Sequence, residues 1–86
     1  MRYRIEIKRS ALKELSKLPA QIRRELTSAI DALAAEPRPA NSKKLSGVEL
    51  YSRRVGNYRV LYEIIDERLL VIVVRAGHRK DVYRHI

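Results

Sequence analysis

The 86-residue chain contains no cysteine, and none of its apolar runs approaches the ~18 residues that a helix needs to span a bilayer. Without cysteine it can form neither disulfides nor thiolate metal sites, so a reducing cytosol is its natural environment. The N-terminus also lacks the apolar segment of a secretion signal. We therefore expect a cytoplasmic protein with no membrane partner.

Acidic residues are scarce as well, since 10 Asp and Glu stand against 19 Lys and Arg and give a formal net charge of +9. Such an excess predicts a polyanionic partner, either nucleic acid or an acidic protein. His78 and His85 have no set of carboxylates or thiolates around them, which disfavours a metal site. There is no glycine-rich phosphate loop, and the scattered carboxylates disfavour a two-metal nuclease. We expect no cofactor.

The length fits one domain over residues 1–86, without repeats or linkers. Apolar residues alternate over Arg2–Lys8, which predicts a half-buried strand. Helical spacing then predicts a short helix from an N-cap at Ser10 to near Pro19, and a second amphipathic helix from there to Glu36. The two apolar stripes fit a helical hairpin laid on a sheet.

The second half of the chain predicts three strands and a polar tail. Residues 37–42 have the composition of a loop. Two strands surround Gly56-Asn57, and a third spans Arg68–Ala76, whose unbroken apolar run is typical of a central strand. The expected fold is α+β: a small, mostly antiparallel sheet with an N-terminal helical hairpin packed on one face. The element order is strand-helix-helix-strand-strand-strand plus C-terminal tail.

The Gly56-Asn57 pair predicts a two-residue hairpin loop with a primed turn. In this register Arg54 lies directly opposite Arg59, on the face that the helices leave open, together with Ser52. Like charges that face each other across a ladder destabilise it by about 0.2–1 kcal/mol. Two explanations stay open: the arginine heads splay into water, or an anion such as a phosphate fills the gap between them.

A two-residue turn at Asp66-Glu67 is expected to place Arg59 opposite Val74, within a few residues of the tail. The side chains expected to converge on one groove are Arg54, Arg59, His78, Arg79 and Tyr83. Such a set suits a phosphodiester beside a base that can stack. Because RNA carries its own nucleophile, the 2′-hydroxyl, metal-free phosphoryl transfer is the chemistry that remains. Lys43 and Lys44 are of functional interest only if they border this face.

Several segments, in their order and spacing, resemble the RelE/ParE superfamily of toxin–antitoxin toxins, most closely its RelE branch. They are Ala11–Leu15 with Leu18-Pro19, Lys44–Gly47, Tyr58–Tyr62, Gly77–Arg79 and Asp81–Tyr83. The resemblance covers nearly the whole chain. It implies a βααβββ core and a metal-independent endoribonuclease that cleaves mRNA in the ribosomal A site. Cleavage in that family proceeds by 2′-hydroxyl attack and leaves a 2′,3′-cyclic phosphate.

The resemblance also implies roles for individual residues. Arg54 matches one of two basic residues on the second strand of the family, and Arg59 matches the arginine that grips the scissile phosphate. Arg79 matches an arginine proposed to help the leaving group. Tyr83 matches the tyrosine that stacks on a base.

One position departs from the family pattern. Ser52 stands where the best-studied members have a second lysine, which leaves the general base open. We expect His78 to replace that lysine in part as a proton carrier, since imidazole titrates near neutral pH. Lys43, Lys44 and Arg53 are expected to bind RNA together with Ser52.

The family further implies a cognate acidic antitoxin that covers the groove, and operator DNA that is bound only through the antitoxin complex. Two other functions remain open. A ParE-like toxin of the same fold would inhibit DNA gyrase by protein–protein contact, without nuclease activity. A generic RNA-binding module would bind RNA in a salt-sensitive way and would not cut it.

Overall fold

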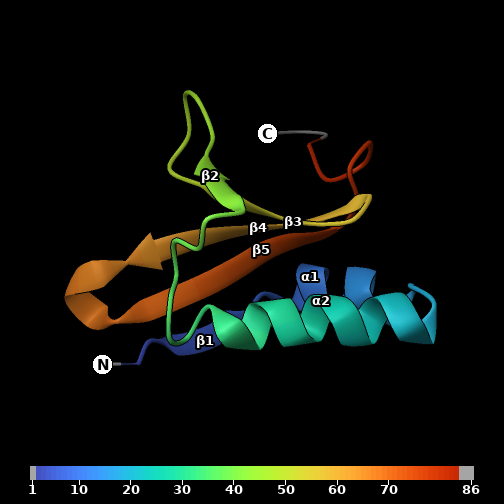
Figure 1. Ribbon diagram of the computed structural model, residues 1–86, viewed down its shortest axis with the longest axis horizontal. Coiled ribbons are helices and arrows are strands. Elements are labelled where there is room, and N and C mark those ends of the chain that lie inside the picture. Colours follow the sequence, from blue (N-terminus) through green and yellow to red (C-terminus); the bar gives the residue numbers. More distant parts are fainter. Residues whose placement is uncertain (1, 84–86) are drawn as a thin grey trace.

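The protein is a two-layer α+β fold, a five-stranded mixed sheet with two helices on one face, which confirms the predicted fold class (Figure 1). The computed structural model describes residues 2–83, so His85 lies outside the described residues. In chain order the elements are β1 (Arg4–Ile7), α1 (Arg9–Ser16), α2 (Ala20–Ala32), β2 (Ser42–Lys44), β3 (Tyr51–Val55), β4 (Tyr58–Ile65), a 3₁₀ helix (Asp66–Arg68) and β5 (Leu70–His78). The sheet order is β1-β5-β4-β3-β2, and only the β1–β5 pair is parallel.

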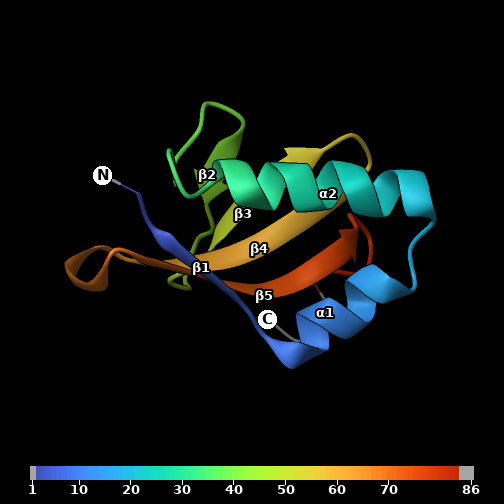
Figure 2. The same ribbon diagram turned by 90° about the horizontal axis from the view of Figure 1, so that it is seen from below.

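The two helices pack on the same face of the sheet but over different strands. Figure 2 shows that α1 lies against β5, whereas α2 crosses β3 and β4. Ser10 is not the N-cap of α1 as predicted, because the N-cap is Lys8, two residues earlier, and it makes no side-chain capping hydrogen bond. Pro19 caps α2, which ends at Ala32 rather than Glu36.

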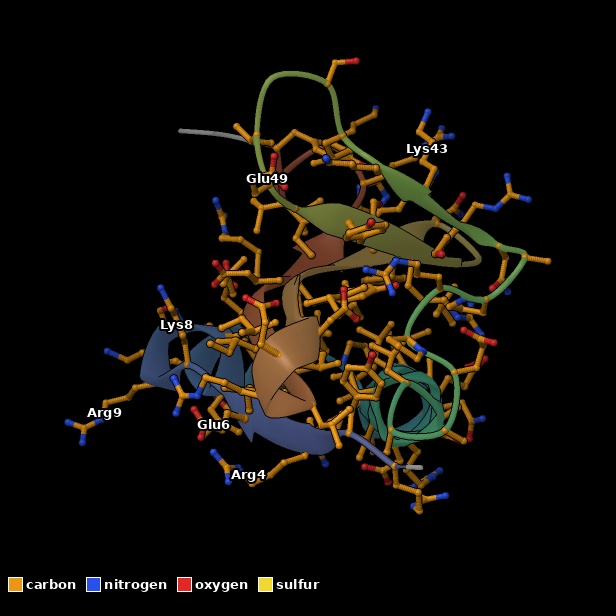
Figure 3. All side chains as sticks on the ribbon, turned by 90° about the vertical axis from the view of Figure 1, so that its left-hand side faces the viewer. Arg4, Glu6, Lys8, Arg9, Lys43 and Glu49 are labelled. Atoms are coloured by element: carbon orange, nitrogen blue, oxygen red, sulfur yellow. The ribbon has the colours of Figure 1, made fainter. Side chains whose placement is uncertain are left out.

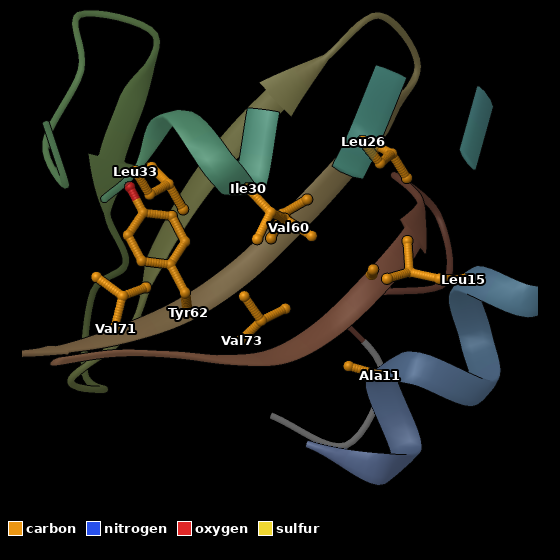
Figure 4. Packing of buried hydrophobic residues seen from close by; sticks show 10 residues of the cluster. Ala11, Leu15, Leu26, Ile30, Leu33, Val60, Tyr62, Val71 and Val73 are labelled. Carbon is orange, nitrogen blue, oxygen red and sulfur yellow. The ribbon is translucent and has the colours of Figure 1, made fainter. Parts of the chain in front are cut away.

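The core is the apolar layer between the helices and the sheet (Figure 4). Its buried members include Leu26, Ile30, Leu33, Val60, Tyr62, Val71 and Val73. Full burial of one such side chain contributes roughly 1.5–3 kcal/mol to folding. Burial raises the pKa of Tyr62, whose hydroxyl donates a hydrogen bond to the Pro37 carbonyl at 2.7 Å. This bond ties the loop after α2 to the middle of the sheet.

The β3–β4 hairpin has the predicted register. Arg54 pairs with Arg59 and Val55 pairs with Tyr58, so Gly56-Asn57 forms the two-residue loop. Gly56 adopts a φ of 60°, and Asn57 is not in the positive-φ region. A positive φ at the first loop residue alone is the pattern of a type II′ turn, one of the two primed turns that match strand twist.

The predicted register between β4 and β5 is wrong by three residues. Asp66–Arg68 forms a 3₁₀ helix that ends at Leu69, in the left-handed region with φ 48°, so the connection is longer than a two-residue turn. An irregularity between Leu61 and Tyr62 adds one more residue on β5. As a result Arg59 lies opposite Gly77 rather than Val74, which brings it closer to the chain that leaves β5.

Strand β2 was not predicted, because its three polar residues show no apolar alternation. It is a short edge strand that pairs antiparallel with β3 and places Lys43 opposite Ser52. Such short, lysine-bearing strands are a common way to protect the edge of a sheet. The loop assigned to residues 37–42 therefore ends within a fifth strand.

The face of the sheet opposite the helices is partly covered by the chain itself, a feature that the expected polar tail did not include. After β5 the backbone turns back over this face, and the amides of Asp81 and Val82 donate to the His78 carbonyl (Figure 1). Val82 is buried over Gly77, where an added β-carbon would lie 3.5 Å from a Val82 methyl. Leu61 on this face is also fully buried. Within residues 2–83 no helix has the length and apolar content to cross a membrane.

Candidate nucleic-acid site

A polar pocket opens on the face of the sheet that the helices do not cover. Its volume is about 360 Å³, within the range of roughly 300–1,000 Å³ typical of ligand sites. We call this the cationic pocket, and its lining residues are Ala40, Asn41, Ser42, Lys43, Ser52, Arg54, Arg59 and Tyr83. These side chains come from the loop before β2, from β2, β3 and β4, and from the turn after β5. Three of the eight are basic, and none of the eight is acidic.

Arg54 and Arg59 form the basic wall of the pocket from two adjacent strands. They are a cross-strand pair, so both guanidinium groups project from the same face of the hairpin. The Arg59 guanidinium donates to the carbonyls of Gly56 and Tyr58, at 3.3 and 3.2 Å, which holds its stem along the hairpin. The backbone amide of Arg54 donates to the Asn41 carbonyl at 3.3 Å, which fixes the opposite rim. The geometry suits an oxyanion that accepts from both forks.

Ser52 and Tyr83 form the other side of the pocket. The two hydroxyl oxygens lie 2.9 Å apart and are hydrogen-bonded. Ser52 is 4% exposed, whereas Tyr83 is 39% exposed. Because Val82 is buried over Gly77, the backbone on which Tyr83 stands is anchored to the sheet. The predicted approach of Tyr83 to Arg54 and Arg59 is therefore found in the structure.

The two lysines of β2 lie on opposite faces. Lys43 lines the cationic pocket next to Ser52, and in Figure 3 it projects from β2, far from the basic residues Arg4, Lys8 and Arg9. Lys44 instead pairs with Glu49, with 3.3 Å between its ammonium nitrogen and a carboxylate oxygen. Lys43 thus meets the condition set for these lysines, because it borders the face that carries Arg54 and Arg59. Lys44 does not border the pocket.

The remaining predicted residues are not among those that line the pocket. Arg53 lies on the other face of β3, where its guanidinium donates to the Arg54 carbonyl. Arg79 is exposed at the end of the sheet, and its amide donates to the Asn57 carbonyl at 2.9 Å. His78 does not converge on the pocket as expected: it pairs with Tyr58 on the helix-bearing face. The two rings meet edge to face with centroids 5.6 Å apart. Its role as a proton carrier stays a prediction.

Sequence reasoning missed the rim formed by Ala40, Asn41 and Ser42, which was assigned only to a loop. The rim is held by turns, in which both the amide and the hydroxyl of Ser42 donate to the Pro39 carbonyl. The turn-forming composition of residues 37–42 signals a bend but not its position. The position depends on contacts that are remote in sequence.

One such contact is an ion pair between Arg38 and Asp66 on the far side of the hairpin. The Arg38 guanidinium donates to both carboxylate oxygens, at 2.9 and 3.3 Å, and its Nε donates to the Tyr51 hydroxyl at 3.1 Å. Tyr3 also donates to Asp66, at 2.6 Å. The hydrogen bonds from Arg38 and then from Tyr3 lower the pKa of Asp66, while the bond to Asp66 raises the pKa of Tyr3.

No group of three or more histidine and carboxylate side chains within residues 2–83 is placed to hold a metal ion. The cationic pocket instead concentrates positive charge on a small concave surface. It can neutralise a phosphate, and it offers an aromatic ring beside that phosphate. The fold and this pocket together define a small basic α+β domain with a cationic pocket on the face of its sheet opposite the helices.

Comparison with known proteins gives the family. Residues 5–83 match the family model described as the ParE toxin of the type II toxin–antitoxin system parDE. The chain belongs to the RelE/ParE family of toxins of type II toxin–antitoxin systems, which confirms the resemblance seen in the sequence.

Individual relatives carry RelE-type names. The chain is 35% identical to toxin RelG of Mycobacterium tuberculosis, over 98% of this chain and 99% of the relative. It is 33% identical to the mRNA interferase toxin RelE of Escherichia coli K12, over 96% and 92% of the two chains.

Solved structures agree with the sequence relatives. The RelBE2 toxin–antitoxin complex of M. tuberculosis contains a chain with a TM-score of 0.82 and 32% identity, over 94% of this chain and 95% of that one. The archaeal RelE–RelB complex of Pyrococcus horikoshii gives a TM-score of 0.82 at 30% identity, over 94% and 99%.

Proposed function

We propose that this toxin is a metal-independent endoribonuclease that cleaves mRNA in the ribosomal A site and thereby stops translation. The observation that carries the proposal is the cationic pocket, in which Arg54 and Arg59 face one another beside Tyr83 and Lys43. A relative at 33% identity is named an mRNA interferase, which supports the same activity at the level of the family.

The proposed reaction uses the nucleophile of the RNA itself. The 2′-oxygen attacks the adjacent phosphorus, so a bond from phosphorus to O2′ forms while the bond to O5′ breaks. The 2′-hydroxyl loses its proton and the departing O5′ gains one, which leaves a 2′,3′-cyclic phosphate and a 5′-hydroxyl end. Negative charge grows on the phosphoryl oxygens in the transition state. Arg54 and Arg59 would stabilise that charge, and one such donor is typically worth about 10²–10³-fold in rate.

The other residues have supporting roles in this proposal. Lys43 lines the pocket and carries exchangeable protons, so we assign proton donation to Lys43 in preference to His78, which packs on Tyr58. Tyr83 lines the same pocket and would contact the RNA. Arg79 would reach the leaving group from the exposed turn beside Asn57. Lys44 and Arg53 point away from the pocket and would contribute only general attraction to RNA.

We infer that a cognate acidic antitoxin binds this toxin. Structural neighbours from M. tuberculosis and P. horikoshii are toxin–antitoxin complexes by their descriptions, and the net charge of +9 suits an acidic partner. Because a bound antitoxin would cover the cationic pocket, operator DNA would be contacted through the complex and not by the free toxin.

The test compares the wild type with Arg59→Ala after brief induction in cells, with transcript 5′ ends mapped across the transcriptome. We expect cuts in phase with the reading frame that disappear in the variant. Purified ribosomes programmed with a defined mRNA should show the same cut in chelator-treated buffer supplemented only with the magnesium that ribosomes need. Equal cutting by the variant would contradict the proposal.

A second candidate is inhibition of DNA gyrase by protein–protein contact, because the matching family model is that of the ParE toxin. This function predicts gyrase-linked DNA breaks after induction and no transcript cleavage. Arg54 and Arg59 would then be dispensable, so Arg59→Ala separates the two candidates in a single experiment.

A further inference from the structure

Apart from Tyr62, whose hydroxyl bonds to Pro37, Ser52 is the one residue with a polar side chain within residues 2–83 that the fold buries almost completely. A buried hydroxyl needs a hydrogen-bond partner, since a missing one costs about 1–3 kcal/mol. The partner of the Ser52 hydroxyl is the Tyr83 hydroxyl, 31 residues later in the chain. This contact joins the middle of β3 to the turn after β5, directly in the wall of the cationic pocket.

Either hydroxyl of this pair could be the donor on distance alone, and the environments of the two groups favour Ser52. A serine hydroxyl has one hydrogen, and the neighbour placed to accept it is the Tyr83 oxygen. Tyr83 is 39% exposed and lines the pocket, so its own hydrogen has room to point elsewhere. When Ser52 donates to Tyr83, the phenol proton turns into the pocket, toward the space between Tyr83 and the two arginines.

We propose that Ser52 is a positioning residue, which fixes the Tyr83 hydroxyl so that it donates a hydrogen bond to a phosphoryl oxygen of the bound RNA. This proposal rests on the proposed function, because it assigns a role to a further residue of the same site. Three donors then converge on one phosphate: two guanidinium forks from β3 and β4, and a phenol held by a serine on β3. The position of the phenol is set by the strand, because Ser52 cannot move without disturbing the ladder that pairs it with Lys43 and Leu61.

The kinetic test is a double-mutant cycle on mRNA-programmed ribosomes, measured as single-turnover cleavage. Ser52→Ala and Tyr83→Phe should each lower the rate by about tenfold to a hundredfold, the range for a hydrogen bond to a charged group. The double variant should be no slower than Tyr83→Phe alone, because Ser52 acts through Tyr83. Ser52→Thr, which keeps the hydroxyl, should recover most of the rate. Ser28→Ala, an exposed serine on α2, is the matched control and should cleave like the wild type.

A second arm does not depend on cleavage. In NMR spectra of the folded toxin, Ser52→Ala should shift the ring signals of Tyr83, whereas Ser28→Ala should not. Binding of a single-stranded 2′-O-methyl RNA, which lacks the nucleophile, should weaken by the same factor in Ser52→Ala and Tyr83→Phe. If the wild type binds this RNA but does not cut mRNA, the proposed function fails while this arm still decides the role of Ser52.

Three results would overturn the inference. Full activity of Tyr83→Phe would show that only the aromatic ring matters and that the hydroxyl is not used. An additional loss from Ser52→Ala in the Tyr83→Phe background would show that Ser52 acts elsewhere. Unchanged Tyr83 ring signals in a folded Ser52→Ala variant would show that the serine does not hold the ring.

Discussion

Arg54 and Arg59 face each other directly across the β3–β4 hairpin, and both line one pocket. A like-charged pair in this position destabilises a sheet by about 0.2–1 kcal/mol. The fold therefore tolerates a local loss of stability at the point where an anion would bind. This relationship connects the stability of the protein to its proposed activity, and the first two predictions depend on it.

Removing either arginine should raise the stability of the fold and lower the cleavage rate together. Arg54→Ala and Arg59→Ala should each increase the free energy of unfolding by about 0.2–1 kcal/mol, because the repulsion disappears. Cleavage of ribosome-bound mRNA should fall by about 10²–10³-fold in the same variants. Urea denaturation and single-turnover cleavage measure the two effects. Arg24→Ala, an exposed arginine on α2, is the control and should change neither.

An anion should stabilise the wild type through the same pair. Replacing chloride by phosphate at constant ionic strength should raise the melting temperature, because phosphate binds only the folded pocket. The rise should be smaller in Arg54→Ala, which keeps one of the two forks. An equal rise in both proteins would mean that the arginine heads splay into water and leave no anion site, the alternative that remained open in the sequence.

Lys43 and Lys44 provide a matched pair for measuring phosphate contacts. Lys43→Ala should weaken binding of single-stranded RNA and reduce the slope of log affinity against log salt by about 0.7, the value for one lost phosphate contact. Lys44→Ala should leave the slope unchanged, because Lys44 faces away and pairs with Glu49. Fluorescence anisotropy titrations between about 50 and 200 mM salt give both values. Equal effects of the two substitutions would contradict the assignment of Lys43 to the pocket.

The Arg38–Asp66 pair should make stability fall in acid. Arg38 and Tyr3 lower the pKa of Asp66 in the folded state below its unfolded value of about 3.9. Its contribution is therefore fully present above that value and is lost as the pH falls through the folded pKa. The wild type should exceed Asp66→Asn in free energy of unfolding at pH 6, and the difference should shrink from about pH 4 downward. In an Arg38→Ala background the difference should depend less on pH, as urea titrations would measure.

The two glycines at the ends of the paired strands should respond differently to alanine. Gly56→Ala forces a β-carbon into the left-handed region and should cost about 1–2 kcal/mol. Gly77→Ala places its β-carbon 3.5 Å from a Val82 methyl, an ordinary contact, and should be tolerated. Thermal denaturation compares the two variants, and a large loss from Gly77→Ala would show that Val82 cannot adjust.

The parts of the fold that could be predicted are those set by local chemistry. The hairpin register follows from the Gly56-Asn57 loop and from strict alternation, so the opposition of Arg54 and Arg59 is predictable from the sequence alone. The register of β5 is not, because Leu69 takes a left-handed conformation that few leucines adopt and nothing near it signals a 3₁₀ helix. The irregularity beside Leu61 is likewise a matter of packing across strands.

The candidate site could be predicted in part for the same reason. Arg54 and Arg59 share a hairpin, so their proximity is local, and the approach of Tyr83 was expected because the tail leaves the last strand only a few residues earlier. The misplacement of His78 arose because its face depends on the register of β5, which was wrong by three residues. The bond between Ser52 and Tyr83 spans 31 residues and has no local signal.

Strand β1 pairs in parallel with β5, so the first strand of the chain completes its ladder only with the last one. Contacts so distant in sequence require loop closure before they stabilise the fold, so they form slowly. During synthesis, β1, α1 and α2 leave the ribosome before the strands that carry Arg54, Arg59 and Tyr83 exist as a sheet. The cationic pocket therefore cannot form until most of the chain has been synthesised, and a partner that binds during or soon after synthesis would meet the molecule before this pocket has been assembled.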